Sequence, residues 1–559
     1  MSDARTLVLM TDELLRHILR YLTRDTEVLD QIGMIDRNAI RRCAEVSRAF
    51  NDVAIDILWE KMKLLSPLTD LLPSFCCIEQ TSVHHELMVV RTGGLIQNSE
   101  WTRFQLYARR IRALDYDHSS IFAGRRAAAI HPDVMLAIAQ HSAPQAALPR
   151  LQNMKSRMVY LTVPYSQLTN LAPTSLRSLS ITLDYCEEQP ISYLEESWDA
   201  VLALLPRCPD LASIHFAASI SLDHPEQCLH LVVKGHSPSK LRTLSLRLSN
   251  DCAVHFVWDL APQWFSSLET LKIDTSSLSR NRCQRPLSSI PASSGKFLFL
   301  VKKLKLYTSI LRAAALLSAT TSKTLMSLGL KFRDVRTNAD QPLFLDSLAT
   351  PLQQFSSTLQ YLSISLHWEW GRALVETALE PVTPWLGPLL SLHGLVEFNI
   401  YAEGMTWILS TTDIWSMARA WPHITWLQVK DSKYELMGMR RDRDLQMTPI
   451  PATVLLAFAE HCPNLQYLSL VPLYLAGEGC SVLENWHPSA DSVSAPQLRV
   501  LVTNILPLIE ETPGPERLKT IEPPSQMQPF LNAIFPNAYC VFWAWRSQFV
   551  RIQPANQHI

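Results

Sequence analysis

A short apolar pattern recurs along most of the 559 residues, and it constrains the fold more than any other feature of the sequence. The pattern is Leu-x-x-Leu-x-Leu with other apolar residues allowed, as in Leu176-Leu179-Ile181. A degenerate copy at Met158 opens the series, and another at Leu498 closes it. The remaining copies start at Leu211, Leu241, Leu268, Val301, Leu325, Leu359, Leu395, Ile424 and Leu465. Such a series predicts a repetitive fold rather than several unrelated domains.

The spacing within each copy is that of a strand that buries one face. The second and third apolar residues are two positions apart, so on a strand they point to the same side, and the first reaches the core from the bend before the strand. A helix would instead need apolar residues at i, i+3, i+4 and i+7. Copies start 18 to 41 residues apart, about 31 on average, which is longer and less even than the roughly 20–29 residues usual for leucine-rich repeats.

Helical segments are expected between the strands. Segments 192–205, 411–421 and 451–461 each carry one apolar stripe and lead into a copy of the pattern. Two junctions are alike, Arg207-Cys208-Pro209-Asp210-Leu211 and His461-Cys462-Pro463-Asn464-Leu465, and the proline stops the helix before the next strand. Because one strand–helix unit cannot bury its apolar face alone, we expect an α/β solenoid with parallel strands on the concave side and helices on the convex side. The alternative is an ordinary α/β domain with leucine-rich strands.

Four regions follow from the distribution of these patterns. Residues 1–65 form a short helical module, 66–150 a mostly helical linker and N-terminal cap, 151–506 the repeat array, and 507–559 a proline-rich linker with a C-terminal cap. Within the array, residues 276–296 are rich in serine, proline and arginine. This composition predicts an exposed loop that trypsin cuts before the strands.

The composition argues against nucleic-acid binding, membrane insertion and secretion. Charged residues make up 18 %, against roughly 25 % in an average soluble protein, and the net charge is −1, so no general attraction to nucleic acid or acidic membranes is expected. No apolar run is long enough for a membrane span, and charges near the N-terminus argue against a signal peptide. The 11 cysteines include no CxxC pair, which favours reduced thiols in the cytosol or nucleus.

Motifs of known chemistry are missing from the sequence. It contains no GxGxxG, GxxxxGK[ST], HExxH or GxSxG, and the adjacent His84 and His85 cannot both face one metal ion from a regular element. We therefore expect no catalytic residues, no cofactor and no metal, and a protein that is not an enzyme. A hydrolase whose catalytic triad is dispersed along a leucine-rich α/β fold is the alternative.

The first 65 residues have a helical rather than a strand pattern. Residues 10–22 carry apolar residues at helical spacing, with Thr11 as a candidate N-cap ahead of two acidic residues. After the charged connection 23–38, residues 40–63 form a second amphipathic helical region. A helical unit this small is marginally stable alone, so it should pack on the array or on a partner.

These helices resemble an F-box, as found in F-box proteins of mushroom-forming fungi. The residues that carry the resemblance are Met10-Thr11-Asp12-Glu13-Leu14-Leu15, Ile18, Leu22, Cys43, Val46-Ser47-Arg48-Ala49-Phe50, Ala54 and Leu58-Trp59. The repeats are similar to the degenerate leucine-rich array that follows in such proteins, so the likeness covers most of the chain. The family usually has Leu-Pro where this chain has Met10-Thr11, which predicts a weaker adaptor contact.

The resemblance implies a function as well as a fold. An F-box protein of this kind is the substrate receptor of an SCF-type cullin–RING ubiquitin ligase: its F-box docks on the Skp-type adaptor, and through it on a cullin, while its repeats hold the target protein. It performs no chemistry itself but raises the local concentration of target lysines. A leucine-rich interaction scaffold without ligase association is the alternative. By resemblance, the adaptor contact would involve Met10, Leu14, Ile18, Leu22, Cys43, Val46, Phe50, Leu58 and Trp59.

The open face of the array is the expected target-binding surface. In each copy, the residues just after the second and third apolar positions point away from the core. The eleven copies from Met158 to Leu465 have 22 such positions, of which five are basic and one, Asp274, is acidic, although the whole chain balances 51 basic against 52 acidic residues. This bias favours an acidic or phosphorylated target, and a chance excess on a solvated face is the alternative. The residues expected to contact the target are Arg247, Lys272, Lys305, Tyr307, Lys331, Tyr401 and Lys430.

Overall fold

The computed structural model divides the chain into two compact units. The first ends at Ser267 and the second begins at Leu268, so the boundary lies inside the predicted array, and each unit is described by itself. The structure describes residues 12–24, 33–74, 76–81, 87–92, 95–117, 129–130, 132–158, 171–183, 204, 207–218, 240–248, 267–275, 300–320, 322–333, 341–367, 380–381, 386–403, 407–431, 450, 452–475, 497–505, 527–544 and 548–552.

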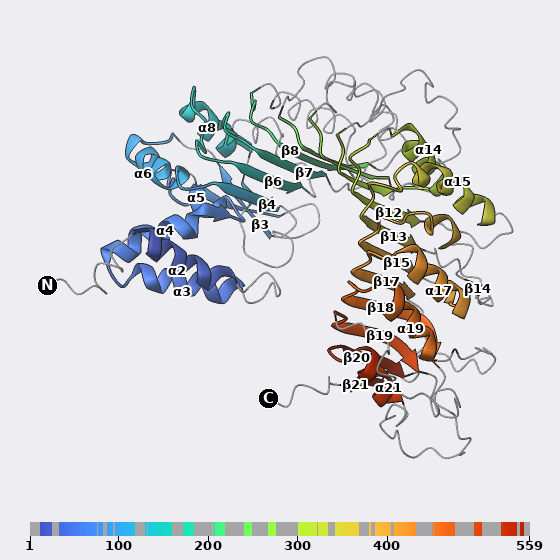
Figure 1. Cartoon of the computed structure of the whole chain (residues 1–559). Coiled ribbons are helices and arrows are strands. Elements are labelled where there is room, and N and C mark those ends of the chain that lie inside the picture. Colours follow the sequence, from blue (N-terminus) through green and yellow to red (C-terminus); the bar gives the residue numbers. More distant parts are fainter. Residues whose placement is uncertain are drawn as a thin grey trace. The chain divides into compact units, whose positions relative to one another are not determined.

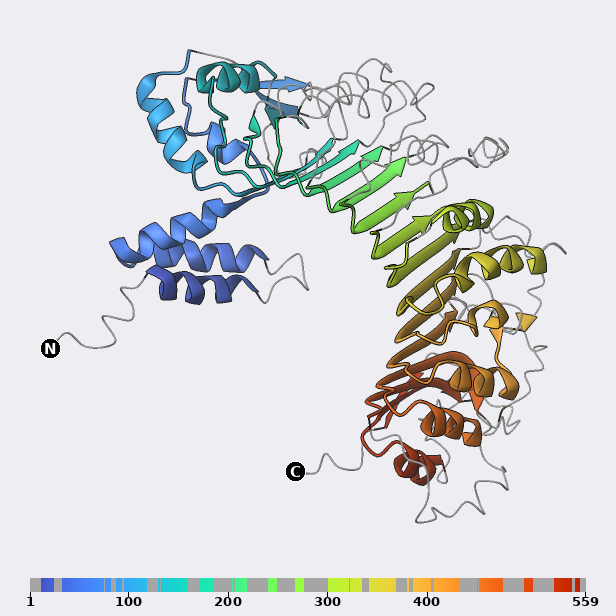
Figure 2. The same ribbon diagram turned by 45° about the horizontal axis from the view of Figure 1, so that its top comes forward.

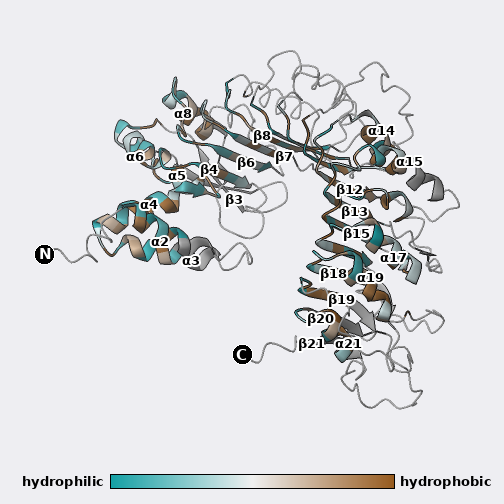
Figure 3. Cartoon of the chain, in the orientation of Figure 1, coloured by the Kyte–Doolittle hydropathy of each residue, from teal (hydrophilic) through white to brown (hydrophobic). Residues whose placement is uncertain are grey.

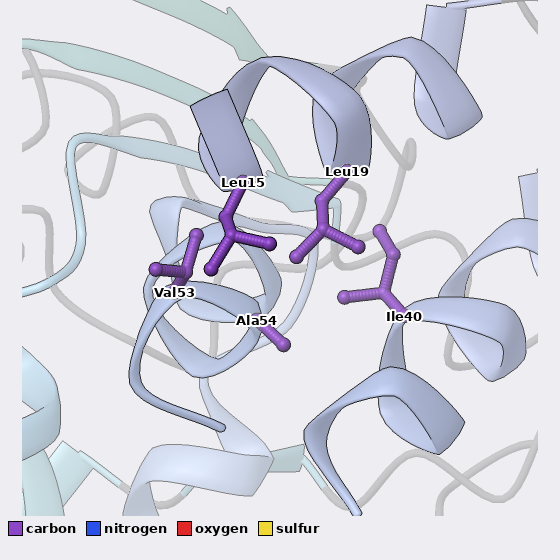
Figure 4. Close-up of a cluster of buried hydrophobic side chains, with 5 residues drawn as sticks. All are labelled: Leu15, Leu19, Ile40, Val53 and Ala54. Atoms are coloured by element: carbon purple, nitrogen blue, oxygen red, sulfur yellow. The ribbon is translucent and has the colours of Figure 1, made fainter. Parts of the chain in front are cut away.

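Three helices open the first unit. They are α2 (Asp12–Arg24), α3 (Gly33–Ala44) and α4 (Arg48–Glu60), and we call them the helical module. They enclose a small core of their own, to which all three helices contribute (Figure 4). Its buried side chains are Leu15, Leu19, Ile40, Val53 and Ala54.

The second helical region of the module differs from the expectation in its bounds. It is two helices rather than one, because the chain turns before Ser47, whose Oγ accepts a hydrogen bond from the backbone N–H of Phe50 over 3.3 Å and so caps α4. Helix α3 begins at Gly33, inside the segment expected to connect the helices. At its far end, α4 stops at Glu60, earlier than the sequence pattern suggested.

The helical module leads directly into a sheet. After α4, residues Lys61–Met62 form β1, which pairs in parallel with β4 (Ala113–Asp117). The next strands of the first unit each pair in parallel with the strand before them, and Figure 1 shows them in succession. They are β6 (Asn153–Met158), β7 (Ser178–Leu183), β8 (Ser213–Ala218) and β9 (Thr243–Leu248).

Region 66–150, expected to be mostly helical, contains strands as well as helices. Besides β4, it contains a separate small sheet in which β2 and β3 pair antiparallel and β3 and β5 pair parallel. These strands are two to six residues long. Each therefore has too few residues to show a clear alternation of apolar and polar side chains in the sequence. The elements of the region other than β4 are α5 (Ser66–Thr69), β2 (Cys76–Thr81), β3 (Leu87–Thr92), α6 (Asn98–Ala108), β5 (Ala129–Ile130) and α8 (Pro132–Ser142).

The second unit continues the same design. Its strand order follows the sequence, and neighbouring strands are parallel as far as β20. The strands are β10 (Thr270–Asp274), β11 (Lys303–Tyr307), β12 (Ser327–Arg333), β13 (Tyr361–His367), β15 (Glu397–Glu403), β17 (Trp426–Asp431), β18 (Tyr467–Leu475), β19 (Val500–Ile505) and β20 (Tyr539–Ala544). The α/β solenoid predicted from the sequence is confirmed.

The helices of the second unit lie along one side of its stacked strands (Figures 1 and 2). We call the opposite side of the sheet the open face. The helices are α14 (Ile310–Ala319), α15 (Gln341–Gln353), α17 (Thr411–Ala420), α19 (Leu456–His461) and α21 (Met527–Ile534), with short 3-10 turns η3 (Gly387–Leu389) and η4 (Ala452–Leu455). A separate two-stranded sheet pairs β14 (Glu380–Pro381) with β16 (Trp407–Ile408).

The repeat pattern sets the register between strands. Leu328 on β12 pairs with Leu362 on β13, which pairs with Phe398 on β15. From the copy at Leu176 to the copy at Leu498, the first apolar residue is at most 1 % exposed, and the described second and third residues are at most 7 % exposed. Hydrophobic and hydrophilic residues consequently both occur along the strands (Figure 3). The core is therefore one continuous layer in each unit, built from the predicted positions.

The opening copy of the repeat is not at Met158-Leu161-Val163. Strand β6 pairs with β7 so that Met154 lies opposite Leu179 and Ser156 lies opposite Ile181. The fully buried Ser156 takes the third position, which is apolar in the copies from Leu176 to Leu465. Because this polar residue interrupts the apolar pattern, the pattern predicted the opening copy at the next apolar triplet, which starts at Met158. Residues 159–170 lie outside the described part.

The parallel series ends near the C-terminus. Strand β20 pairs in parallel with β19, and β21 (Gln548–Ile552) pairs antiparallel with β20. The segment between β19 and α21, where the proline-rich linker was expected, lies outside the described residues. So do the expected loop 276–296 and most of the expected helix 192–205.

Candidate protein-binding surfaces

Helix α2 presents two apolar side chains to solvent. Leu14 is 38 % and Ile18 is 43 % exposed, while the neighbouring apolar residues of α2 face the module core. At about 100° per residue, this pair lies about 160° around the helix from Arg16 and Arg20. Since both arginines bind carboxylates of α4, the apolar pair faces away from those contacts.

Among the module's large apolar side chains whose burial the structure describes, Val46 is the most exposed, at 69 %. It precedes the N-cap Ser47, and an apolar residue there often packs against the fourth residue of the helix. In α4 this residue is Asn51, whose amide instead donates a hydrogen bond to the carbonyl oxygen of Ala44 over 3.0 Å. Helix α4 thus gives Val46 no apolar partner at this position. Leu14, Ile18 and Val46 together are called the apolar triplet.

Other residues expected at the adaptor contact are less accessible. Cys43, Phe50 and Leu58 are half-buried and pack against the module core. Met10 lies outside the described residues, and so does the side chain of Leu22, although its backbone belongs to α2. Contact of these residues with an adaptor stays a prediction.

Trp59, also expected at the adaptor contact, packs within the first unit. Its ring lies against Tyr107 of α6, with ring centroids 4.6 Å apart and planes inclined by 40°. One residue later, the carbonyl oxygen of Glu60 accepts a hydrogen bond from the backbone N–H of Arg112 over 2.9 Å. The end of α4 is therefore held by the residues that lead into β4.

Two carboxylates one turn apart on α4 strengthen this attachment. Asp56 binds the guanidinium of Arg16 on α2 over 2.8 Å and that of Arg110, which follows α6, over 2.5 Å. Glu60 binds Arg20 on α2 over 2.9 Å. Helix α4 consequently links α2 on one side to the start of the array on the other.

Two of the lysines expected at the target contact flank one tyrosine in the second unit, and a third lies on the same strand as that tyrosine. Lys272 on β10 and Lys331 on β12 place their Nζ atoms 4.9 Å and 5.8 Å from the ring centroid of Tyr307 on β11. Lys305 pairs in register with both Lys272 and Gly329. A Cβ atom on Gly329 would lie 3.3 Å from Cγ of Lys305, so the lysine side chain lies over β12. We call these three lysines and Tyr307 the lysine cluster.

Two charged residues of the expected surface do not join the cluster. Arg247 is exposed on β9, but it belongs to the first unit. Asp274, the one acidic residue counted on this face, is buried and lies opposite Tyr307 in the strand register. Of the three lysines, Lys305 is exposed, and Lys272 and Lys331 are half-buried.

The remaining residues of the expected surface form a smaller group on later strands. The Nζ atom of Lys430 on β17 lies 6.0 Å from the ring centroid of Tyr401 on β15. The imidazole of His367 on β13 meets the same ring edge to face, with centroids 6.4 Å apart. A histidine and a lysine from the two neighbouring strands thus lie beside one tyrosine here.

A row of aromatic side chains on the open face was missed by the sequence analysis. Tyr361 on β13, Trp426 on β17 and Tyr467 on β18 share one register position, and Glu397 on β15 stands between the first two. Tyr361 is 37 % and Trp426 41 % exposed, and the rings of Trp426 and Tyr467 stack 3.7 Å apart, inclined by 6°. These three residues are called the aromatic row.

The signal for the aromatic row was present in the sequence. On a strand, the residue before the second apolar position points to the same side as the residues after the second and third positions. The predicted target contact includes only the latter two positions, so one of the three rows of the face lies outside it.

The two cysteines at the similar helix–strand junctions have structural contacts. Each buried thiol donates a hydrogen bond to the preceding repeat: Cys208 to the carbonyl oxygen of Pro173 over 3.5 Å, and Cys462 to that of Ala418 over 3.4 Å. Burial raises the pKa of the Cys208 thiol, and it raises the pKa of the Cys462 thiol to about 12. Both thiols therefore stay protonated at neutral pH.

Among the described residues, no three His, Cys, Asp or Glu side chains lie close enough together to hold a metal ion. None of the helices that the structure describes has the length and apolar character needed to cross a membrane.

The similarity of this chain to known proteins is remote. No protein-family model and no curated protein matches the sequence. The leucine-rich repeat-containing protein LegL7 from Legionella pneumophila matches with 13 % identity and a TM-score of 0.30, over 60 % of this chain and 87 % of its own. The Rad7 and Elc1 complex in yeast matches with 14 % identity and a TM-score of 0.30, over 67 % of this chain and 82 % of that chain. The fold assignment therefore rests on the strand register and burial described above.

Proposed function

We propose that this protein is the substrate-recognition subunit of an SCF-type cullin–RING ubiquitin ligase. In this proposal the helical module docks on the Skp-type adaptor, and through it on a cullin, while the repeats hold the target protein. The observation that carries the proposal is the apolar triplet, which lies exposed on a module that already has a buried core of its own. Exposed apolar side chains that the core does not use are available to a partner. The F-box resemblance of the same helices supports the adaptor as that partner.

The attachment of the module to the array supports the same proposal. A receptor of this type acts by proximity, so it has to hold its target at a defined position relative to the ligase. Helix α4 runs into β1 without a linker, and Asp56 joins α2 to Arg110. The chain itself would perform no chemistry, and it would act in the cytosol or nucleus.

Co-purification of the intact chain with a Skp-type adaptor tests this proposal. Val46→Asp should abolish binding, because losing a central apolar anchor often costs about 2 kcal/mol or more, and a carboxylate at the contact would also lose its hydration. Leu106→Asp is the matched control, since Leu106 is an exposed leucine of α6 outside the module, and it should leave binding unchanged. Full-strength binding by the Val46→Asp chain would contradict the assignment of the apolar triplet as the adaptor contact.

A second function is favoured by one specific observation. The chain passes from the module directly into the edge strand β1, and Asp56 of the module forms an ion pair with Arg110, which precedes β4. A cap that covers the end of a solenoid would do the same. In this alternative the protein is a leucine-rich interaction scaffold without ligase association. The intact chain would then bind target proteins but co-purify with no Skp-type adaptor, whether or not Val46 is changed.

A further inference from the structure

Two groups of side chains share the open face of the second unit. The lysine cluster lies on β10 to β12, and the aromatic row lies on β13 to β18. Both groups occupy positions that alternate along the strands with buried core residues. The face therefore offers one partner a cationic end and an aromatic end.

The cationic end suits one compact dianion better than separate carboxylates. Lys272 and Lys331 approach the same ring from the two strands that flank it, and Lys305 lies over the second of these strands. A phosphorylated side chain carries roughly −1.5 to −2 charges at neutral pH and three strong acceptor oxygens. Several ammonium groups around one point match this charge, whereas an aspartate or glutamate side chain brings a single charge. Lysine also binds phosphate well as a point charge.

The aromatic end suits an apolar anchor residue of the partner. Tryptophan and tyrosine are enriched in the centres of protein interfaces, where they supply much of the binding energy. Trp426 and Tyr467 are already stacked, so little further ordering is needed when a partner covers them. An aromatic or branched aliphatic side chain packed on this pair would bury area that water now reaches.

The distance between the two ends predicts the spacing of the partner's residues. Tyr307 and Trp426 are four strands apart in the order β11-β12-β13-β15-β17, and their register positions differ by four residues along the strands. With about 4.8 Å between strands and about 3.3 Å per residue, the two side chains are about 23 Å apart. An extended segment of about seven residues spans this distance.

A nucleic acid fits this face less well than a protein segment does. Its backbone is negatively charged along its whole length, so it is usually bound by a continuous cationic groove. Here Glu397 stands within the aromatic row between Tyr361 and Trp426, and it would repel such a backbone. Three of the four lysines expected on this face lie on β10 to β12, and Lys430 lies on β17. This concentration of positive charge favours a segment that carries its negative charge at one residue.

We propose that the open face of the second unit binds an extended protein segment with two anchors. A phosphorylated serine or threonine of the segment occupies the lysine cluster, and an aromatic or branched aliphatic residue about seven positions away packs on Trp426 and Tyr467. The inference rests on the proposed function, since it names the class of target that the receptor holds. It also makes capture of the target conditional on phosphorylation.

Selection from a phosphopeptide library by the intact chain tests both anchors. Each peptide carries one fixed phosphoserine with randomised residues on both sides. We expect enrichment of Trp, Tyr, Phe, Leu or Ile about six to eight residues from the phosphoserine, and binding at least about tenfold weaker after phosphatase treatment. Selection that ignores the phosphate, or that shows no preference at this spacing, overturns the proposal.

Single variants then separate the two ends. Lys305→Glu should remove the dependence on phosphate and keep the preference for an aromatic or aliphatic residue, whereas Trp426→Ala should do the reverse. Lys323→Glu is the matched charge control, because Lys323 is an exposed lysine in the turn before β12. If a variant loses its circular dichroism signal, the milder Lys305→Gln and Trp426→Leu replace it. Variants that fold but leave both preferences intact contradict the inference.

Two further measurements test a nucleic acid as the ligand and the adaptor as a separate partner. A single-stranded RNA of about 20 nucleotides that binds more tightly than the best peptide would assign the face to nucleic acid and overturn the inference.

Adaptor co-purification of the same variants separates the inference from the proposed function. Phosphopeptide selection that fails while the adaptor still binds removes only the inference. An adaptor that fails to bind while selection succeeds removes only the ligase assignment, and the Val46→Asp chain should select the same peptides as the unchanged protein.

Discussion

Replacing Asp56 with alanine should loosen the helical module from the first repeats. The Asp56 carboxylate binds Arg16 over 2.8 Å and Arg110 over 2.5 Å, and the side chains involved are 20–35 % exposed. Exposed ion pairs contribute about 0.2–1 kcal/mol each. These two are short and partly shielded from water, so we assign about 1 kcal/mol to each, and Asp56→Ala should lower the free energy of opening α4 by about 2 kcal/mol.

Native-state hydrogen exchange of the α4 backbone amides measures this opening. A loss of about 2 kcal/mol corresponds to exchange that is about thirtyfold faster. A double-mutant cycle with Arg110→Ala isolates one of the two pairs and should give a coupling energy of about 1 kcal/mol. The pair of Glu60 and Arg112 provides the control, because its atoms are 3.8 Å apart and half of the arginine side chain is exposed, so its coupling should be much smaller.

Two results would refute this reasoning. Unchanged exchange of the α4 amides in the Asp56→Ala chain would mean that the apolar contacts alone hold the module. Equal coupling energies for the two pairs would mean that distance and exposure do not decide the strength of these contacts. Raising the salt concentration should reduce the Asp56–Arg110 coupling, since the pair remains partly exposed.

Three other changes test the array itself. Leu427→Ala removes a fully buried side chain of β17 and should lower the free energy of unfolding by about 2–5 kcal/mol in urea titration; a loss below about 1 kcal/mol would contradict the proposed core. Ser410→Ala breaks the reciprocal cap in which Ser410 Oγ accepts from the Asp413 N–H over 3.1 Å, and the Asp413 carboxylate accepts from the Ser410 N–H over 2.8 Å; we expect a loss of about 1 kcal/mol, and none from Thr411→Ala. Because the pKa of the buried Cys462 thiol is raised to about 12, this thiol should resist iodoacetamide at pH 8. Its unfolded form ionises near pH 8.5, so the free energy of unfolding should fall as the pH rises from about 9 toward 12; rapid labelling of native Cys462, or rising stability in that window, would disprove the assigned burial.

The strand register was predictable because burying one face of a strand imposes a period of two. Leu359, Leu362 and Ile364 follow the repeat pattern, and all three are buried. A slip of one residue would turn the apolar residues of a strand to the open face, so the pattern leaves one acceptable register. The helices α17 and α19 were predictable for the same kind of reason, since their apolar residues recur with the period of a helix.

Other features depend on contacts between distant parts of the chain. Ser156 is buried at a position where the pattern requires an apolar residue, and Trp59 packs on Tyr107 of α6. Local periodicity carries no information on such partners, because it reports which side of an element is buried but not what covers that side. The packed module was also needed to tell which expected adaptor residues are exposed and which are half-buried. The apolar triplet is exposed, whereas Cys43 and Phe50 are half-buried.

By itself, the sequence determined where the strands of the array from β7 to β19 lie, which of their apolar residues are buried, and that the repeats stack. Those properties follow from apolar spacing within a few residues of each other. Only the tertiary structure decided which exposed side chains meet on the open face, such as Lys272, Tyr307 and Lys331 from three strands, or Trp426 and Tyr467 from two. These groups form because register and a strand spacing of about 4.8 Å bring together residues that are far apart in the chain.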